Sequence, residues 1–175
     1  MVRPNYVKFT LQEIMMENLH KIAIWIKNNC HNINFIPIDK INIHITLCFL
    51  GDIIKNYHVD KKLRLKEIHT VINKFNTFLS NSDLPNNLIF EKYDLFPESK
   101  QNLIVAKFKC SEKFMDTIIE FKKQFIIFGI NDNKIFVPHV TLGKIQFKYI
   151  NTHINLCAIP TENIGLIKIL GCKFV

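Results

Sequence analysis

The sequence lacks the features that direct a chain into a membrane or out of the cell. No apolar run is long enough to span a bilayer, and no cleavable signal pattern follows Met1. The five cysteines are odd in number and none belongs to a Cys-x-x-Cys pair, which argues against a disulfide framework and against zinc. We therefore expect an intracellular protein, cytoplasmic or nuclear, with reduced thiols and no membrane association.

Arginine is scarce although the chain is basic. The formal net charge is +8, yet Arg3 and Arg64 are the only arginines among 23 basic residues. The lysines are spread along the chain without a dense basic tail. A basic surface favours polyanions such as nucleic acid, but abundant Lys, Ile and Asn are also expected from an AT-rich genome. Charge therefore supports a nucleic-acid ligand without establishing one.

Two short motifs, each inside a β-like stretch, carry the chemical information of the chain. They lie 95 residues apart and read His44-Ile45-Thr46-Leu47 and His139-Val140-Thr141-Leu142. Because strand side chains alternate between faces, the His and Thr of each motif share one face and the apolar residues anchor the other. A lone His-x-Thr is usually polar decoration, but two copies with apolar backing predict one cleft. Two imidazoles and two hydroxyls there suit acid–base cleavage of a phosphodiester.

Periodicity predicts one α+β domain over residues 1–175. The expected strands are 5–10, 41–50, 88–95, 103–109, 137–147 and 164–174. The expected helices are 11–30, 60–80 and 111–128, with Ser111 as N-cap and Gly129 just after the last one. Residues 28–40 are expected to form a loop, and residues 81–87 are the clearest break. Gly51 and Gly143 follow the two motifs at similar distances, which indicates a weak internal duplication.

The motif segments resemble the 2H phosphoesterase superfamily. FIPIDKINIHITLCFLGDI, FVPHVTLGKI and the intervening YDLFPESKQNLIVAKFK are similar to the RNA 2′,3′-cyclic phosphodiesterases, also called 2′-5′ RNA ligase-like proteins. The opening Arg3-Pro4-Asn5-Tyr6-Val7 resembles instead the nucleotide-binding domain of an A-kinase anchoring protein. The resemblance covers residues 3 to 174. It implies a LigT-like fold of two pseudo-symmetric lobes, with antiparallel sheets around a central cleft and helices outside.

The resemblance also implies an activity, the hydrolysis of a 2′,3′-cyclic phosphate on RNA or an oligonucleotide to a 2′-phosphate. His44 and His139 would be the catalytic acid and base, with His139 as the base that activates water. Thr46 and Thr141 would bind the phosphate oxygens. This scheme requires no metal or other cofactor, and the chain has no cluster of carboxylates suited to magnesium.

Three further residues are weaker candidates for substrate binding. Lys144 follows the second motif, where the cyclic phosphodiesterases often have arginine, but its odd separation from His139 requires a bulge near Gly143. Phe96 and Tyr6 are candidates for stacking on a base.

Other functions remain open at this point. A 2′-5′ oligoadenylate phosphodiesterase would use the same paired histidines. A module that binds AMP or CMP without turnover would fit the Arg3–Val7 opening. A monomer that binds RNA, an oligonucleotide or a mononucleotide is the expected form in each case.

Overall fold

The computed structural model of the chain describes residues 5–51, 60–130, 135–148 and 154–175. The described residues form eight strands, β1 Asn5–Thr10, β2 Ile33–Pro37, β3 Ile45–Gly51, β4 Asn87–Phe96, β5 Leu103–Lys109, β6 His139–Lys148, β7 Leu166–Lys168 and β8 Gly171–Phe174. They also form three α-helices, α1 Glu13–Asn29, α2 Lys61–Asn81 and α3 Glu112–Lys123. Short 3₁₀ turns cover Lys40–Asn42, Ile126–Phe128 and Leu156–Ala158.

The strands form one antiparallel sheet that divides naturally into two halves. Their order is β7-β4-β5-β6-β3-β1-β8, and β2 also pairs with β6. The two halves meet at β3 and β6, which share the single registered pair Ile45–Val140. One half is therefore β3-β1-β8, the other is β2-β6-β5-β4-β7, and each carries one His-x-Thr motif. The predicted α+β architecture with two lobes is confirmed.

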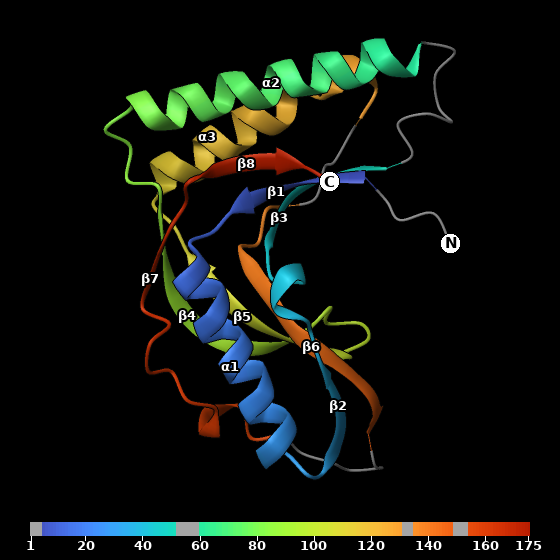
Figure 1. The fold of residues 1–175 in the computed structure, drawn as a ribbon, viewed down its shortest axis with the longest axis vertical. Coiled ribbons are helices and arrows are strands. Elements are labelled where there is room, and N and C mark those ends of the chain that lie inside the picture. Colours follow the sequence, from blue (N-terminus) through green and yellow to red (C-terminus); the bar gives the residue numbers. More distant parts are fainter. Residues whose placement is uncertain (1–4, 52–59, 131–134, 149–153) are drawn as a thin grey trace.

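The helices cross between the halves. Helix α1 follows β1 in sequence but packs against β2 and β6 of the other half, whereas α2 packs against β8. Helix α3 follows β5 but lies beside α2, where the Phe75 and Phe121 rings stack at 4.2 Å. Figure 1 shows α2 and α3 together over β8 and β1 at one end of the molecule, and α1 along the other half. Each half is thus covered by at least one helix that is connected in sequence to a strand of the other half.

Local sequence explains the helix ends that were predicted. The Ser111 side chain accepts a hydrogen bond from the Phe114 N–H at 3.2 Å, so the predicted N-cap of α3 is confirmed. Gly129 has a left-handed backbone with φ +71°, as expected after a helix. The helix itself stops at Lys123, however, and the predicted remainder continues as a 3₁₀ turn.

The apolar backing of the motifs forms part of a continuous core. Ile45 and Val140 have no exposed surface, and Leu47 and Leu142 are buried beside them. One cluster of buried hydrophobic side chains extends through both halves, and no polar or charged residue among those described is buried. Burial of these faces therefore fixes which way the motif histidines and threonines point.

The loop predicted over residues 28–40 was wrong, because it contains strand β2. Ile33 and Phe35 are buried while Asn34 and Ile36 are exposed, which is ordinary strand alternation. Pro37 ends the strand and does not interrupt it.

The single final strand predicted over residues 164–174 was also wrong, because the segment forms two short strands at opposite ends of the sheet. Strand β7 pairs with β4 and strand β8 pairs with β1. Between them, the N–H of Ile169 donates to Asn86 and the N–H of Leu170 donates to Thr10. Continuous apolar character cannot distinguish one long strand from two short strands that share a core.

The strand predicted over residues 41–50 begins later than expected. A 3₁₀ turn occupies Lys40–Asn42 and β3 starts at Ile45. His44 therefore lies immediately ahead of the strand. His139 is the first residue of β6, and Pro138 directly precedes it. No helix among the described residues is long and apolar enough to cross a membrane.

The position of Ile45 at the junction of the two halves predicts that its replacement destabilises the protein far more than replacement of a nearby exposed isoleucine. Replacing Ile45 by Ala should reduce the free energy of unfolding by about 2–5 kcal/mol, because the side chain is fully buried at the one β3–β6 pair registered among the described residues. Urea denaturation measures the change. The matched control is Ile41→Ala, whose side chain is 82% exposed and whose loss should cost no more than about 0.5 kcal/mol. Equal losses in the two variants would contradict the assigned role of the pair.

Candidate active site

Antiparallel pairing of β3 with β6 brings the two motifs together. Ile45 lies opposite Val140, so continuing that register by one residue in each direction places His44 opposite Thr141 and Thr46 opposite His139. The arrangement is diagonal, with each histidine facing the threonine of the other motif. All four residues are half-buried, which leaves them accessible from the open side of the sheet. The pairing of β3 with β6 thus brings the two predicted motifs side by side, and the catalytic roles of the four residues stay predictions.

Both histidines make the same hydrogen bond to the backbone. His44 Nδ1 lies 2.6 Å from the Asn42 carbonyl oxygen, and His139 Nδ1 lies 2.7 Å from the Val137 carbonyl oxygen. A carbonyl oxygen only accepts, so each ring must donate from a protonated Nδ1. In the neutral form the lone pair is then on Nε2 in both rings. This fixes one tautomer for both, as acid–base chemistry at Nε2 requires.

An aromatic ring covers each imidazole. Tyr6 of β1 stacks on His44 with ring centroids 5.1 Å apart and planes at 20°. Phe96 of β4 lies against His139 with centroids 4.6 Å apart and planes at 35°. The two aromatic residues predicted to stack on a substrate base thus contact the two histidines. Their contacts restrict the imidazole planes on both sides of the cleft.

A lysine on the neighbouring strand also accompanies each histidine. In the paired registers, Lys8 of β1 lies opposite Thr46, and Lys107 of β5 lies opposite His139. Lys107 forms an ion pair with Asp94 at 2.6 Å. Lys8 forms no ion pair with any residue in the described ranges.

Burial and these charges make both histidines harder to protonate. For His44, burial lowers the pKa, the hydrogen bond to Asn42 partly opposes it, and the charges of Lys8 and His139 lower the pKa further. For His139, burial also lowers the pKa, the hydrogen bond to Val137 opposes it, and the charge of Lys107 adds to the lowering. The site is therefore a positively biased cleft that an anion would complement.

A cavity of ≈ 290 Å³ lies over the second motif. Its lining includes Thr46, His139, Thr141 and Phe96, together with Lys122 of α3. The remaining lining residues are mainly apolar and comprise Leu47, Cys48, Phe49, Leu103, Ile135, Phe136 and Val137. Polar groups on an apolar surround are typical of a small-molecule site.

Lys144 reaches the same face of the sheet as the motif through a bulge. The pairing of β5 with β6 shifts between Ile104 and Val105, so that Thr141 pairs with Val105 but Lys144 pairs with Leu103. The extra residue turns Lys144 onto the face of Thr141, which meets the condition set by the sequence. Lys144 is exposed and is not one of the cavity-lining residues. Its contact with substrate stays a prediction.

The two glycines that suggested a duplication have different roles. Gly51 has a left-handed backbone with φ +64°, where glycine is preferred. At Gly143 a Cβ atom would lie 2.3 Å from the Ile36 carbonyl oxygen and from the Phe35 ring, so the close approach of β2 requires glycine there. The similarity of the two segments is therefore not a similarity of backbone geometry.

Sequence reasoning missed Lys8 and Lys107. Alternation in β1 places Tyr6, Lys8 and Thr10 on one face, and this signal could have identified Lys8. Lys107 had no comparable signal, because its position depends on the register of β5 against β6. Of the Arg3–Val7 opening, Arg3 and Pro4 lie outside the described residues. No cluster of three or more His, Cys, Asp or Glu side chains that could hold a metal occurs in the part of the chain that the structure describes.

Comparison with known proteins gives a clear answer for the fold. No family model and no curated protein matches the sequence. Among solved structures, TT0787 of Thermus thermophilus aligns over 99% of this chain and 84% of its own, with TM-score 0.62 and 17% identity. The E. coli LigT structure complexed with 3′-AMP aligns over 87% and 78%, with TM-score 0.56 and 16% identity. The chain has the LigT-like fold.

A further structure with this fold is described as a phosphoesterase. It aligns over 82% of this chain and 73% of its own, with TM-score 0.53 and 17% identity. At this level of identity the likeness concerns the LigT-like fold alone. The chemistry of the present chain therefore has to be argued from its own residues.

Because one lysine lies near each histidine, we expect each lysine to affect the pKa of its own histidine more than that of the other. Replacing Lys8 by Gln should raise the pKa of His44, and replacing Lys107 by Gln should raise the pKa of His139, because each change removes a positive charge that opposes protonation. NMR titration of the imidazole Cε1–H signals measures both. Each variant is the control for the other. An equal rise of both pKa values in either variant would contradict the local assignment.

Proposed function

We propose that the chain is a phosphodiesterase of the 2H phosphoesterase superfamily that hydrolyses a 2′,3′-cyclic phosphate on RNA or an oligonucleotide to a 2′-phosphate. The observation that carries the proposal is the diagonal pairing of the motifs at Ile45–Val140. It brings two imidazoles with the same tautomer and two hydroxyls together across β3 and β6, and the side chains of Thr46, His139 and Thr141 line one cavity. A phosphodiester requires this set of groups on both sides of the phosphorus.

The reaction uses the two Nε2 atoms in opposite directions. Following the resemblance, neutral His139 accepts a proton from water as the water oxygen bonds to phosphorus. The bond from phosphorus to the 3′ oxygen breaks, and protonated His44 donates its Nε2 proton to that oxygen. The products are a 3′-hydroxyl and a 2′-phosphate. The roles of the histidines exchange in the reverse direction, in which the 3′-hydroxyl attacks the 2′-phosphate and water leaves.

The threonines and the charge of the site complete the chemistry. The Thr46 and Thr141 hydroxyls can donate to the non-bridging oxygens, where negative charge develops. Both histidines have a lowered pKa in the free protein, so an unliganded site favours two neutral rings. A bound phosphate supplies the negative charge that stabilises one protonated ring beside one neutral ring.

The other candidate residues fit around this centre. We assign Tyr6 and Phe96 to holding the imidazole planes, because each ring contacts one histidine. Lys144 is a candidate for contact with a substrate phosphate from the face of the sheet that carries Thr141. A nucleotide ligand is further supported by the E. coli LigT structure of the same fold, which is a complex with 3′-AMP.

The central prediction concerns the two histidines. His44→Ala and His139→Ala should each reduce kcat by about 10²–10⁴-fold, because each removes one proton-transfer group. Product analysis uses an RNA that ends in a 2′,3′-cyclic phosphate, and the expected product is a 2′-phosphate. His31→Ala is the matched control, since His31 is an exposed loop residue. Thermal unfolding of all variants separates lost activity from lost structure.

The same experiment distinguishes the alternatives. Cleavage of 2′-5′ oligoadenylate without conversion of the cyclic phosphate would assign the chain to the oligoadenylate phosphodiesterases. Binding of AMP or CMP with no cleavage of either substrate would favour a nucleotide-binding module. Full activity in either histidine variant would overturn the proposed mechanism.

A second prediction separates the hydroxyls from the packing of the threonines. Thr46→Val and Thr141→Val should each reduce kcat by about 10²–10³-fold with a smaller change in KM, because the donor acts on charge that develops in the transition state. Thr→Ser at the same positions retains the hydroxyl and should restore most of the rate. Steady-state kinetics measures the split, and failure of serine to rescue would assign the threonines a packing role.

A further inference from the structure

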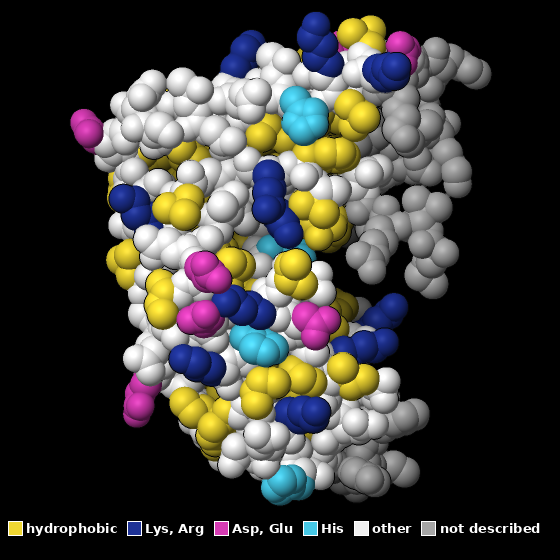
Figure 2. Space-filling model, in the orientation of Figure 1, with side chains coloured by type: hydrophobic (Ala, Val, Ile, Leu, Met, Phe, Trp, Pro, Cys, Tyr) yellow, Lys and Arg dark blue, Asp and Glu magenta, His cyan; other side chains and the backbone are white. Residues whose placement is uncertain are grey.

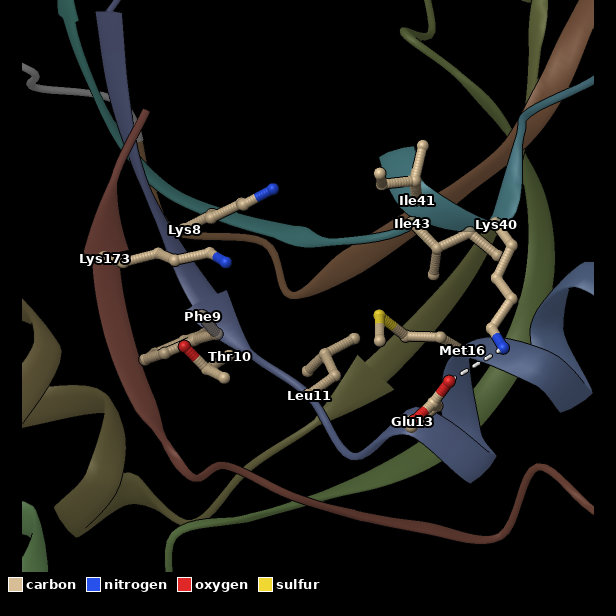
Figure 3. Close-up of a pocket in the computed structure, with 10 residues that line it drawn as sticks. All are labelled: Lys8, Phe9, Thr10, Leu11, Glu13, Met16, Lys40, Ile41, Ile43 and Lys173. Carbon is tan, nitrogen blue, oxygen red and sulfur yellow. Dashed lines mark hydrogen bonds and ion pairs between the residues drawn. The ribbon is translucent and has the colours of Figure 1, made fainter.

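A second cavity lies next to the motif residues, and the proposed reaction does not use it. Its volume is ≈ 390 Å³, which is within the range of small-molecule sites. Figure 3 shows Lys8 and Lys173 extending side by side into this space from β1 and β8, with Ile41, Ile43 and Lys40 on the opposite side.

The two lysines are continuous with the motif across three strands. Lys8 lies opposite Thr46 on β3 and also opposite Lys173 on β8. Residues directly paired across strands share a face of the sheet, so Thr46, Lys8 and Lys173 form one row. Neighbouring strands are about 4.8 Å apart, so the row leads away from the phosphate position in steps of that size.

The charges in the cavity are unbalanced on one side. Lys40 on the opposite wall is neutralised by Glu13 at 3.1 Å and Glu17 at 2.8 Å, and Figure 3 shows the contact with Glu13. Within the described residues, neither Lys8 nor Lys173 has an acidic partner. Burial and then the charge of Lys173 lower the pKa of Lys8, which an anion between the two ammonium groups would reverse.

Apart from Thr10, the remainder of the cavity is apolar. Leu11 and Met16 line it together with Ile41 and Ile43, and Ile41 is 82% exposed at its edge. Figure 2 shows basic side chains scattered in ones and twos over the face of the molecule that it draws. The cavity is thus a local site and not part of a broad basic patch. Its two lysines can bind one phosphate, and its apolar wall can contact one flat apolar group.

We propose that this cavity binds the next phosphate and nucleoside of an oligonucleotide whose terminal cyclic phosphate lies at the two motifs. Lys8 and Lys173 hold the phosphate, and the apolar wall contacts the nucleoside without hydrogen-bond readout of the base. The proposal rests on the proposed function and names its substrate as an oligonucleotide in preference to a mononucleotide.

Three substrates of increasing length test the proposal. They are a nucleoside 2′,3′-cyclic phosphate, the same compound with a 5′-phosphate, and the dinucleotide that ends in the cyclic phosphate. We expect kcat/KM to rise by about fivefold or more when the phosphate is added, and again when the second nucleoside is added. A gain from the phosphate alone would overturn the nucleoside part, and equal values for all three would overturn the whole.

A charge variant assigns the gain to this cavity. Lys173 is the residue to change, because Lys8 also acts on His44. In Lys173→Gln the ratio of kcat/KM for the dinucleotide to that for the nucleoside cyclic phosphate should fall about fivefold. The matched control is Lys168→Gln, another exposed lysine, which lies on β7 at the opposite end of the sheet and should leave the ratio unchanged. An unchanged ratio in Lys173→Gln contradicts the proposal.

Direct binding separates failure of this proposal from failure of the proposed function. A fluorescein-labelled deoxyribotrinucleotide, which lacks the 2′-hydroxyls, is titrated with the protein at several salt concentrations. Lys173→Gln should weaken its binding about fivefold and reduce the salt slope, whereas Lys168→Gln should change neither. If turnover is absent but this pattern holds, the subsite stands and the activity fails. If turnover is present without the pattern, the activity stands and the subsite fails.

Discussion

The site depends on one pair of residues, Ile45 and Val140, which join two sheet halves at a single registered position. Neither side chain is exposed, so the pair is fixed by the hydrophobic core and not by the polar groups beside it. A slip of one residue would turn every side chain on one strand to the opposite face. The core therefore specifies the register, and the register places each histidine across from the threonine of the other motif.

The burial that fixes this register also sets the electrostatics of the site. Both imidazoles are partly withdrawn from water, which lowers the pKa of each, and the hydrogen bond to a backbone carbonyl only partly opposes this. Lys8 and Lys107 lie on the neighbouring strands and act in the same direction. A cleft with neutral rings, hydroxyl donors and nearby lysines is complementary to a phosphate and unfavourable for binding a cation. The proposed chemistry and the proposed oligonucleotide subsite both follow from this bias.

The crossing of the helices gives the cleft its support. Helix α1 leaves one half of the sheet to pack on the other, and α3 does the reverse. The segment between β7 and β8 connects the two outer edges of the sheet. Because the core is continuous through both halves, the two motifs are held by packing on both sides and not by the one strand pair alone. Geometry at the phosphorus needs this kind of support, since acid–base catalysis depends on the placement of the donor and acceptor atoms.

The sequence alone determined the paired motifs, the face on which each His and Thr lies, most of the elements, and through resemblance the fold. These properties depend on local alternation and on residue type. Tertiary structure decided where β2 runs, how the final segment divides into β7 and β8, and which lysines accompany His44 and His139. Each of these depends on the register between strands far apart in sequence, which periodicity does not encode. The bulge that turns Lys144 toward the face of the motif also depends on tertiary structure, because only the pairing of β5 with β6 reveals the extra residue.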